Sequence, residues 1–220
     1  MEVIPAILPK TKEELDAQLK ALSPFFSSFH IDIADGEFVP NKTADIKDLI
    51  STIQQYNHIA IDFHLMVFDY NREFPKIRSI GQLAPVKHVI VHFKLFPEKE
   101  IFEEGNYPFV VGVALNPDEE VKTLATNYEL KTIPFVQIMS VNPGFQGSSF
   151  IKETLNKVEQ LRLLDYRNKI FLDGGINEKT IPLILSEQYH PDILCVGSYL
   201  TRTENISERV TRLQTLLKTP

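Results

Sequence analysis

The stretch FHIDIADGEFVPN, residues 29–41, begins as a buried β-strand that carries two polar side chains. His30 and Asp32 stand where a packed strand normally has Val or Ile. Because side chains two residues apart on a strand point to the same side, the imidazole and the carboxylate share one face. The stretch therefore predicts a strand, and its two polar residues indicate that one face of this strand serves a function other than packing.

Seven further runs of the chain have the length and composition of short strands. They are apolar nearly throughout instead of alternating, which is typical of parallel strands that are covered on both faces. The eight predicted strands are VIPAIL (3–8), SFHIDIA (28–34), AIDFHLMV (60–67), HVIVHF (88–93), FVVGVAL (109–115), FVQIMSV (135–141), KIFLDG (169–174) and ILCVGS (193–198).

Segments of helical period lie between these strands. Apolar residues recur at spacings of three and four over residues 46–53 and 206–217, as expected for amphipathic helices. A helix over 70–81 is predicted less clearly, because Pro75 interrupts it. The predicted N-caps are Thr11, with Glu14 at capping-box spacing, Thr43 and Asn177.

A strand followed by a helical segment, repeated eight times, predicts an α/β fold. We expect a single (β/α)₈ TIM barrel that spans residues 1–220, a length near the lower limit for this architecture. An open doubly wound sheet with a ligand at its switch point is the alternative. The absence of GxGxxG after the first strand weakens the dinucleotide-binding form of that alternative.

Composition limits the partners of this protein. The 220 residues are 43% hydrophobic and 24% charged, with a net charge of −6, which argues against a nucleic-acid surface. The single cysteine, Cys195, cannot form an internal disulfide. The sequence has no cationic, apolar leader and no apolar run of membrane-spanning length, so we expect a cytoplasmic protein without a membrane partner.

Four polar side chains fall near the carboxyl ends of three predicted strands, where the sites of both candidate folds form. A lone buried histidine is usually a satisfied core residue, and the aspartate of a DGG sequence often serves a turn. Two imidazoles and two carboxylates together instead form a mixed set suited to Zn²⁺, Fe²⁺, Mn²⁺ or Co²⁺, or to acid–base catalysis. The four are His30, Asp32, His64 and Asp173.

Glycines follow the last three predicted strands. Loops after the seventh and eighth strands of such barrels commonly bind phosphate through backbone N–H groups. The candidate residues are Gly144, Phe145, Gln146 and Gly147, then Gly174 and Gly175, then Gly197 and Ser198.

The order of these motifs resembles the ribulose-phosphate 3-epimerase family. The resemblance extends over roughly residues 3 to 200 and implies a TIM barrel that inverts carbon 3 of a phosphorylated ketose. It implies one divalent metal ion, and it leaves a homo-oligomer open. It rests on HIDIADGEFVPN, HLMV, GVALNP, IMSVNPGFQG, FLDGGIN and CVGSYL, in that order.

The resemblance also implies roles for individual residues. Asp32 and Asp173 match the acid–base pair of the family, and with His30 and His64 they match its metal ligands. The glycine loops match its phosphate-binding loops. Met66 and Met139 match methionines near the family's intermediate, although plain core packing explains them equally well.

Several positions depart from the family pattern and bear on the substrate. Ala6 replaces a serine that contacts substrate, Ala34 replaces a methionine, and Lys94 stands where a glutamate is frequent. GFQGSS also replaces the more usual GFGGQ. An epimerase for another ketose phosphate, such as a hexulose 6-phosphate, and a barrel that binds sugar phosphate without turnover therefore stay open. A related decarboxylase or synthase is disfavoured, because no lysine forms their DxKxxD motif beside Asp32.

Overall fold

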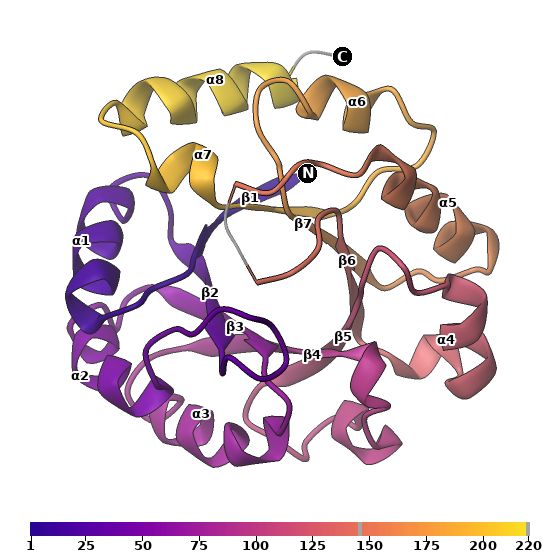
Figure 1. The fold of residues 1–220 in the computed structure, drawn as a ribbon, viewed down its shortest axis with the longest axis horizontal. Coiled ribbons are helices and arrows are strands. Elements are labelled where there is room, and N and C mark those ends of the chain that lie inside the picture. The colour runs from indigo at the N-terminus through magenta and orange to yellow at the C-terminus, as the bar shows by residue number, and fades with distance from the viewer. Residues whose placement is uncertain (145–146, 219–220) are drawn as a thin grey trace.

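The computed structural model describes residues 1–144 and 147–218, and their strands close into a parallel barrel. Each strand pairs with its neighbours in chain order, and β1 pairs with β8, which excludes the open doubly wound sheet. Figure 1 looks into the ring of strands and shows the helices around it. The strands are β1 Glu2–Ile7, β2 Ser28–Ala34, β3 Ala60–Met66, β4 Val86–His92, β5 Val110–Leu115, β6 Phe135–Met139, β7 Lys169–Asp173 and β8 Ile193–Val196.

The helices form the outer layer, and their apolar faces pack on the outward side chains of the strands. The two clearest sequence predictions are confirmed, because residues 46–53 and 206–217 lie within α2 and α8. The α-helices are α1 Lys12–Leu22, α2 Ile46–Gln55, α3 Phe74–Ile80, α4 Val121–Asn127, α5 Asn156–Leu163, α6 Ile181–Leu185, α7 Ser198–Thr201 and α8 Ile206–Lys218. The 3₁₀ turns are η1 Tyr70–Arg72, η2 Phe93–Leu95, η3 Lys99–Phe102, η4 Leu130–Thr132 and η5 Lys152–Leu155.

The connection between β4 and β5 departs from the predicted repeat, because its described residues form only η2 and η3 and no α-helix. Pro97 and Pro108 restrict this segment, and Phe96 takes the left-handed conformation at φ 47°. The helical segment predicted after every strand is therefore present here only as short 3₁₀ turns.

Helix caps follow the sequence only in part. Thr11 caps α1 as predicted, since its hydroxyl accepts a hydrogen bond from the Glu14 N–H. Thr43 does not cap α2, because Asp45 accepts the Lys47 N–H instead, and the Thr43 hydroxyl bonds the backbone of Ala34. The latter contact joins the end of β2 to its loop.

Two further helix predictions need correction at their starts. Asn177 accepts the Lys179 N–H within a turn. Thr180 occupies the position before α6, and its side chain makes no capping hydrogen bond. Pro75 does not break α3, because it lies in the first turn of that helix, where its missing N–H has no partner to lose.

The interior of the barrel is divided along its axis. An apolar layer crosses the middle of the barrel, and polar side chains lie above it at the carboxyl ends of the strands. No helix in the described part of the chain is both long enough and apolar enough to cross a membrane. The apolar layer consists of Ile4, Ala6, Ile90, Ala114, Phe135, Met139, Phe171, Ile193 and Cys195.

Candidate active site and metal centre

Strand register brings the four predicted polar residues together. His30 and Asp32 project from β2, and parallel pairing places Asp32 directly beside His64 on β3. Asp173 is the last residue of β7, which is separated from β2 by β1 and β8. The two carboxylates therefore reach the centre of the barrel mouth from different sides.

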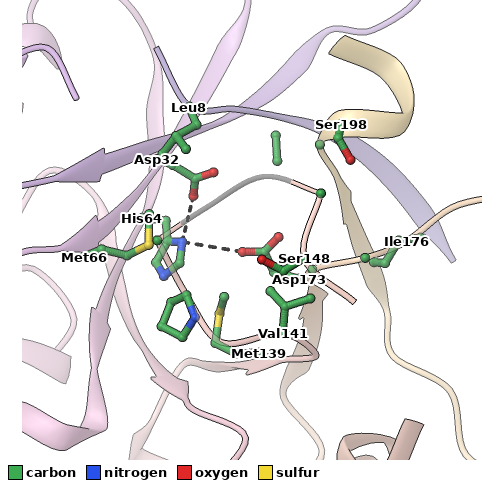
Figure 2. Close-up of a pocket in the computed structure, with 17 residues that line it drawn as sticks. Leu8, Asp32, His64, Met66, Met139, Val141, Ser148, Asp173, Ile176 and Ser198 are labelled. Carbon is green, nitrogen blue, oxygen red and sulfur yellow. Dashed lines mark hydrogen bonds and ion pairs between the residues drawn. The ribbon is translucent and has the colours of Figure 1, made fainter. Parts of the chain in front are cut away.

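The four side chains form one compact cluster. Their ligating atoms all lie within 4.8 Å of one another, and all four residues are buried. Figure 2 shows Asp32 and Asp173 directed at the His64 ring, whose Nδ1 lies 2.8 Å from Asp32 Oδ1 and 3.5 Å from Asp173 Oδ2. His30 Nε2 lies 3.5 Å and 4.0 Å from the same two oxygens. The structure thus places all four candidates at a single point.

The backbone around Asp173 is held by the neighbouring strand. The Ser140 N–H donates to the Asp173 carbonyl at 2.7 Å, and the Ser140 hydroxyl contacts the carbonyls of Asp173 and Gly174. The amide of Gln137, which is fully buried, donates to Asp173 Oδ2 at 3.3 Å. These contacts fix the Asp173 carboxylate, which lines a cavity at the mouth of the barrel.

The environments of the two carboxylates separate their pKa values. Burial raises the pKa of Asp173 to about 6, and the negative charge of Asp32 adds to this effect. Burial also acts to raise the pKa of Asp32, but the adjacent His30 and His64 rings outweigh it and lower the value to about 2. A pair of carboxylates with separated pKa values suits a reaction that needs both an acid and a base.

The donor set fits a divalent metal ion. His30 Nε2 is buried and has no hydrogen-bond partner among the described residues, a state that costs about 1–3 kcal/mol. The other ring nitrogen of His30 lies 3.7 Å from the Cys195 sulfur, so Nε2 is the atom that faces the carboxylates. A cation placed among these nitrogens and oxygens would give Nε2 its missing partner.

Metal affinity is expected to fall as the pH is lowered from 7 to 5. Asp173, with its pKa raised to about 6, takes up a proton in this range that the metal must displace. Burial lowers the pKa of His30, but Cys195 and Asp32 outweigh burial and raise it well above its ordinary value, so His30 must also release a proton. We expect a loss of about tenfold per pH unit for each displaced proton. Co²⁺ titrations at pH 5, 6 and 7 test this, and an affinity independent of pH would contradict it.

The glycine loops border the same cavity. Gly174 has φ 115°, and a Cβ atom there would lie 2.4 Å from the Val141 side chain. A Cβ at Gly144, at φ 113°, would lie 2.9 Å from that of Val39. A side chain at either position would therefore collide with a neighbouring valine. The predicted binding residues that line it are Gly144, Gly147, Gly174, Gly175, Gly197, Ser198, Met66 and Met139, whereas Phe145 and Gln146 lie outside the described residues.

The loop after β2 makes hydrogen bonds to loops that follow other strands of the barrel. Asp35 accepts the N–H groups of Glu37 and Phe38, and its second oxygen accepts the Phe68 N–H at 2.6 Å. The Asn41 amide donates to the Gly144 carbonyl at 2.8 Å. The DGEFVPN part of the opening stretch therefore ties the loops after β2, β3 and β6 together.

Ala6 and Ala34, the two alanines that depart from the family pattern, differ in their position relative to the cavity. Ala6 lines the cavity, but Ala34 is not among the described residues that do so. Ala34 instead packs with Val39 and Met66 beside the cavity. Of the two substitutions, only the one at position 6 therefore lies where a ligand bound in the cavity would touch it.

Sequence reasoning missed two residues that contact the four-residue cluster. His92 is fully buried at the end of β4, with its Nε2 2.9 Å from His64 Nε2. Gln137 reaches Asp173 from β6. Both are polar residues inside strands predicted to be apolar, which is the signal that singled out His30 and His64.

Comparison with known proteins identifies relatives over nearly the whole chain. The sequence model described as the Ribulose-phosphate 3 epimerase family matches residues 2–201. The ribulose-phosphate 3-epimerase of Bacillus subtilis is 29% identical over 90% of this chain and 91% of its own length. That of Aquifex aeolicus is 30% identical over 86% of this chain and 83% of its own length.

Solved structures are similar in fold. A mutant tryptophan synthase alpha-subunit from Pyrococcus furiosus superposes with a TM-score of 0.69 at 14% identity, covering 99% of this chain and 98% of that one. A 3-hexulose-6-phosphate synthase gives a TM-score of 0.65 at 16% identity, covering 98% and 99%. At such identities the likeness concerns the barrel alone.

Proposed function

Because the chain belongs to the ribulose-phosphate 3-epimerase family, we propose that it is a sugar-phosphate 3-epimerase that interconverts D-ribulose 5-phosphate and D-xylulose 5-phosphate. The observation that carries this proposal is the cluster of Asp32, Asp173 and two histidines at the mouth of the barrel, beside the glycine loops. The relatives that match over most of the chain carry the same activity in their names.

The chemistry explains why two carboxylates are needed. The proton on carbon 3 is acidified by the adjacent carbonyl, and its removal leaves an enediolate. Return of a proton to the opposite face inverts the carbon, which requires a proton carrier on each side. Asp32 and Asp173 come from strands on different sides of the barrel mouth and are proposed as the two carriers.

Four residues are proposed to hold a divalent ion, whose identity stays open among Zn²⁺, Fe²⁺, Mn²⁺ and Co²⁺. That ion would supply positive charge to offset the negative charge that develops on the substrate oxygens. The glycine loops are proposed to bind the phosphate through backbone N–H groups and to place carbon 3 between the carboxylates. The four proposed ligands are His30, Asp32, His64 and Asp173.

A coupled assay of the purified protein on ribulose 5-phosphate tests this function. We expect turnover that is lost after chelation and regained with one of the four metals. Absence of turnover with every metal, together with tight binding of the sugar phosphate, would instead favour a non-catalytic binding protein. A homo-oligomer and a cytoplasmic location stay predictions.

Restoring a hydroxyl at position 6 is expected to improve the use of ribulose 5-phosphate. Ala6 lines the cavity, and a ligand group without its hydrogen-bond partner costs about 1–3 kcal/mol. Ala6→Ser should therefore lower KM for this substrate by about fivefold or more. Ala34→Ser is the matched control, because Ala34 is not among the described residues that line the cavity. An unchanged or higher KM in Ala6→Ser, with faster turnover of another ketose phosphate, would show that ribulose 5-phosphate is the wrong substrate.

A further inference from the structure

His92 forms the wall behind one of the proposed metal ligands. It is the last residue of β4 and it is fully buried, and its ring centroid lies 5.0 Å from that of His64. The Phe38 ring covers it on another side at 4.6 Å. The Nε2 atoms of the two histidines are 2.9 Å apart, which is hydrogen-bond distance.

This contact constrains the hydrogens of both rings. Two N–H groups cannot point at each other across 2.9 Å, so one Nε2 donates and the other accepts. His64 Nδ1 is the nitrogen that faces Asp32 and Asp173. To bind a metal, this Nδ1 needs a free lone pair, so the hydrogen of a neutral His64 must lie on Nε2. His64 then donates to His92 Nε2, and the hydrogen of His92 must lie on Nδ1.

The surroundings of His92 suit this arrangement. Its Nδ1 and the side-chain oxygen of Asn116 are both buried without a hydrogen-bond partner among the described residues. Asn116 is the polar side chain next to the His92 ring, but the two are not hydrogen-bonded to each other in this structure. A small shift of the Asn116 amide would let its Oδ1 accept a hydrogen from His92 Nδ1 and would give both buried atoms a partner.

Asn116 is itself held in place by charged groups. Its N–H donates to the Glu119 carboxylate at 2.6 Å, and its carbonyl accepts from the buried Lys157 ammonium at 2.5 Å. Lys157 also contacts the carbonyls of Pro117 and Glu119, so the turn after β5 is fixed at several points. His64, His92 and Asn116 are thus consecutive neighbours, and the backbone of Asn116 is held by Glu119 and Lys157.

We propose that His92 is a positioning residue that stabilises the metal-binding tautomer of His64 by accepting the hydrogen on His64 Nε2, with Asn116 as the acceptor for the hydrogen of His92. The inference rests on the proposed metal site. Without metal, the 2.8 Å contact between His64 Nδ1 and Asp32 Oδ1 suits the opposite arrangement, in which His92 Nε2 is the donor. With a metal held at His64 Nδ1, that atom would have lost its proton to solvent, the proton of His92 Nε2 would lie on His64 Nε2, and His92 Nδ1 would have taken up one proton from solvent. The two neutral rings would then carry two N–H hydrogens in total, as they do without metal.

Metal affinity of designed variants tests the role of His92. His92→Phe keeps a ring of similar size but removes the acceptor, and we expect the dissociation constant for Zn²⁺ or Co²⁺ to rise by about 10–100-fold. His92→Gln places an amide oxygen near the position of Nε2 and should recover most of this loss. An affinity of His92→Phe equal to that of the unaltered protein would overturn the proposal.

His88→Phe is the matched control. His88 lies on the same strand as His92, and its Nδ1 is 2.8 Å from the buried Asp62, so both histidines have a buried side-chain partner. It lines a separate cavity at the amino-terminal end of the barrel. We expect this variant to bind metal as the unaltered protein does, and equal losses in His88→Phe and His92→Phe would overturn the proposal by showing a general effect on the fold.

Nitrogen NMR of the unaltered protein gives a readout that does not depend on variants. In Zn²⁺-loaded protein labelled with ¹⁵N-histidine, we expect the hydrogen of His64 on Nε2 and that of His92 on Nδ1. A hydrogen on Nε2 of His92 would overturn the proposal. Failure of the unaltered protein to bind any divalent metal would refute the metal site itself, whereas normal binding with the wrong tautomers would refute only the role of His92.

Discussion

Replacing either Asp32 or Asp173 by asparagine is expected to lower kcat for epimerisation by about 10²–10⁴-fold, the usual contribution of a positioned acid or base. Asparagine keeps the size of the side chain and one oxygen atom, but it cannot take up or return a proton. Inversion needs a transfer on each face of carbon 3, so one remaining carboxylate is not sufficient. Kinetics with ribulose 5-phosphate and with xylulose 5-phosphate give the measurement.

Metal content must be determined in both variants, because the same aspartates are proposed ligands. Asp62→Asn provides a control, since Asp62 is also buried on a barrel strand but pairs with His88 away from the cluster. We expect this control to keep its turnover. Near-native epimerisation by metal-loaded Asp32→Asn and Asp173→Asn would contradict the two-carboxylate mechanism.

Removal of the metal is expected to produce the second large effect. Stabilisation of developing negative charge by a metal ion contributes several kcal/mol, so a chelated protein should lose about 10²-fold or more in kcat. Activity should return when the appropriate metal is added, and elemental analysis of the native protein identifies that metal.

The variant His64→Ala tests whether the metal required for turnover is bound by the four-residue cluster. Loss of one of four ligands should weaken metal binding by at least tenfold, since even supporting partners of ligands contribute that much. His190→Ala, at an exposed histidine on the outer layer, serves as the control and should bind metal normally. Unchanged metal content in His64→Ala would remove His64 from the site.

The barrel could be predicted from the sequence because its strands have a strong local signature. Eight apolar runs at regular spacing leave few arrangements, and register then brings His30, Asp32 and His64 to one point. The β4–β5 connection could not be predicted as irregular, because its prolines and the left-handed Phe96 act through local geometry instead of periodicity.

Parts of the site depend on contacts between distant segments, which periodicity does not encode. His92 and Gln137 have the same polar-in-strand signal as His30, but their partners become evident only when neighbouring strands are placed side by side. Thr43 illustrates the reverse case, since its sequence position suits a cap while tertiary structure gives its hydroxyl to Ala34. The sequence thus indicated the proposed reacting groups more readily than the residues that contact them.

Exchange of the carbon 3 proton with solvent deuterium tests the central claim most directly. Metal-loaded Asp32→Asn and Asp173→Asn are each given ribulose 5-phosphate and xylulose 5-phosphate in D₂O, and carbon 3 is followed by NMR. If the two carboxylates serve opposite faces, each variant should exchange the proton of only one epimer, the two variants should prefer different epimers, and neither should form the other sugar at an appreciable rate. Exchange from both epimers in each variant, accompanied by near-native product formation, would contradict the assignment of one carboxylate to each face.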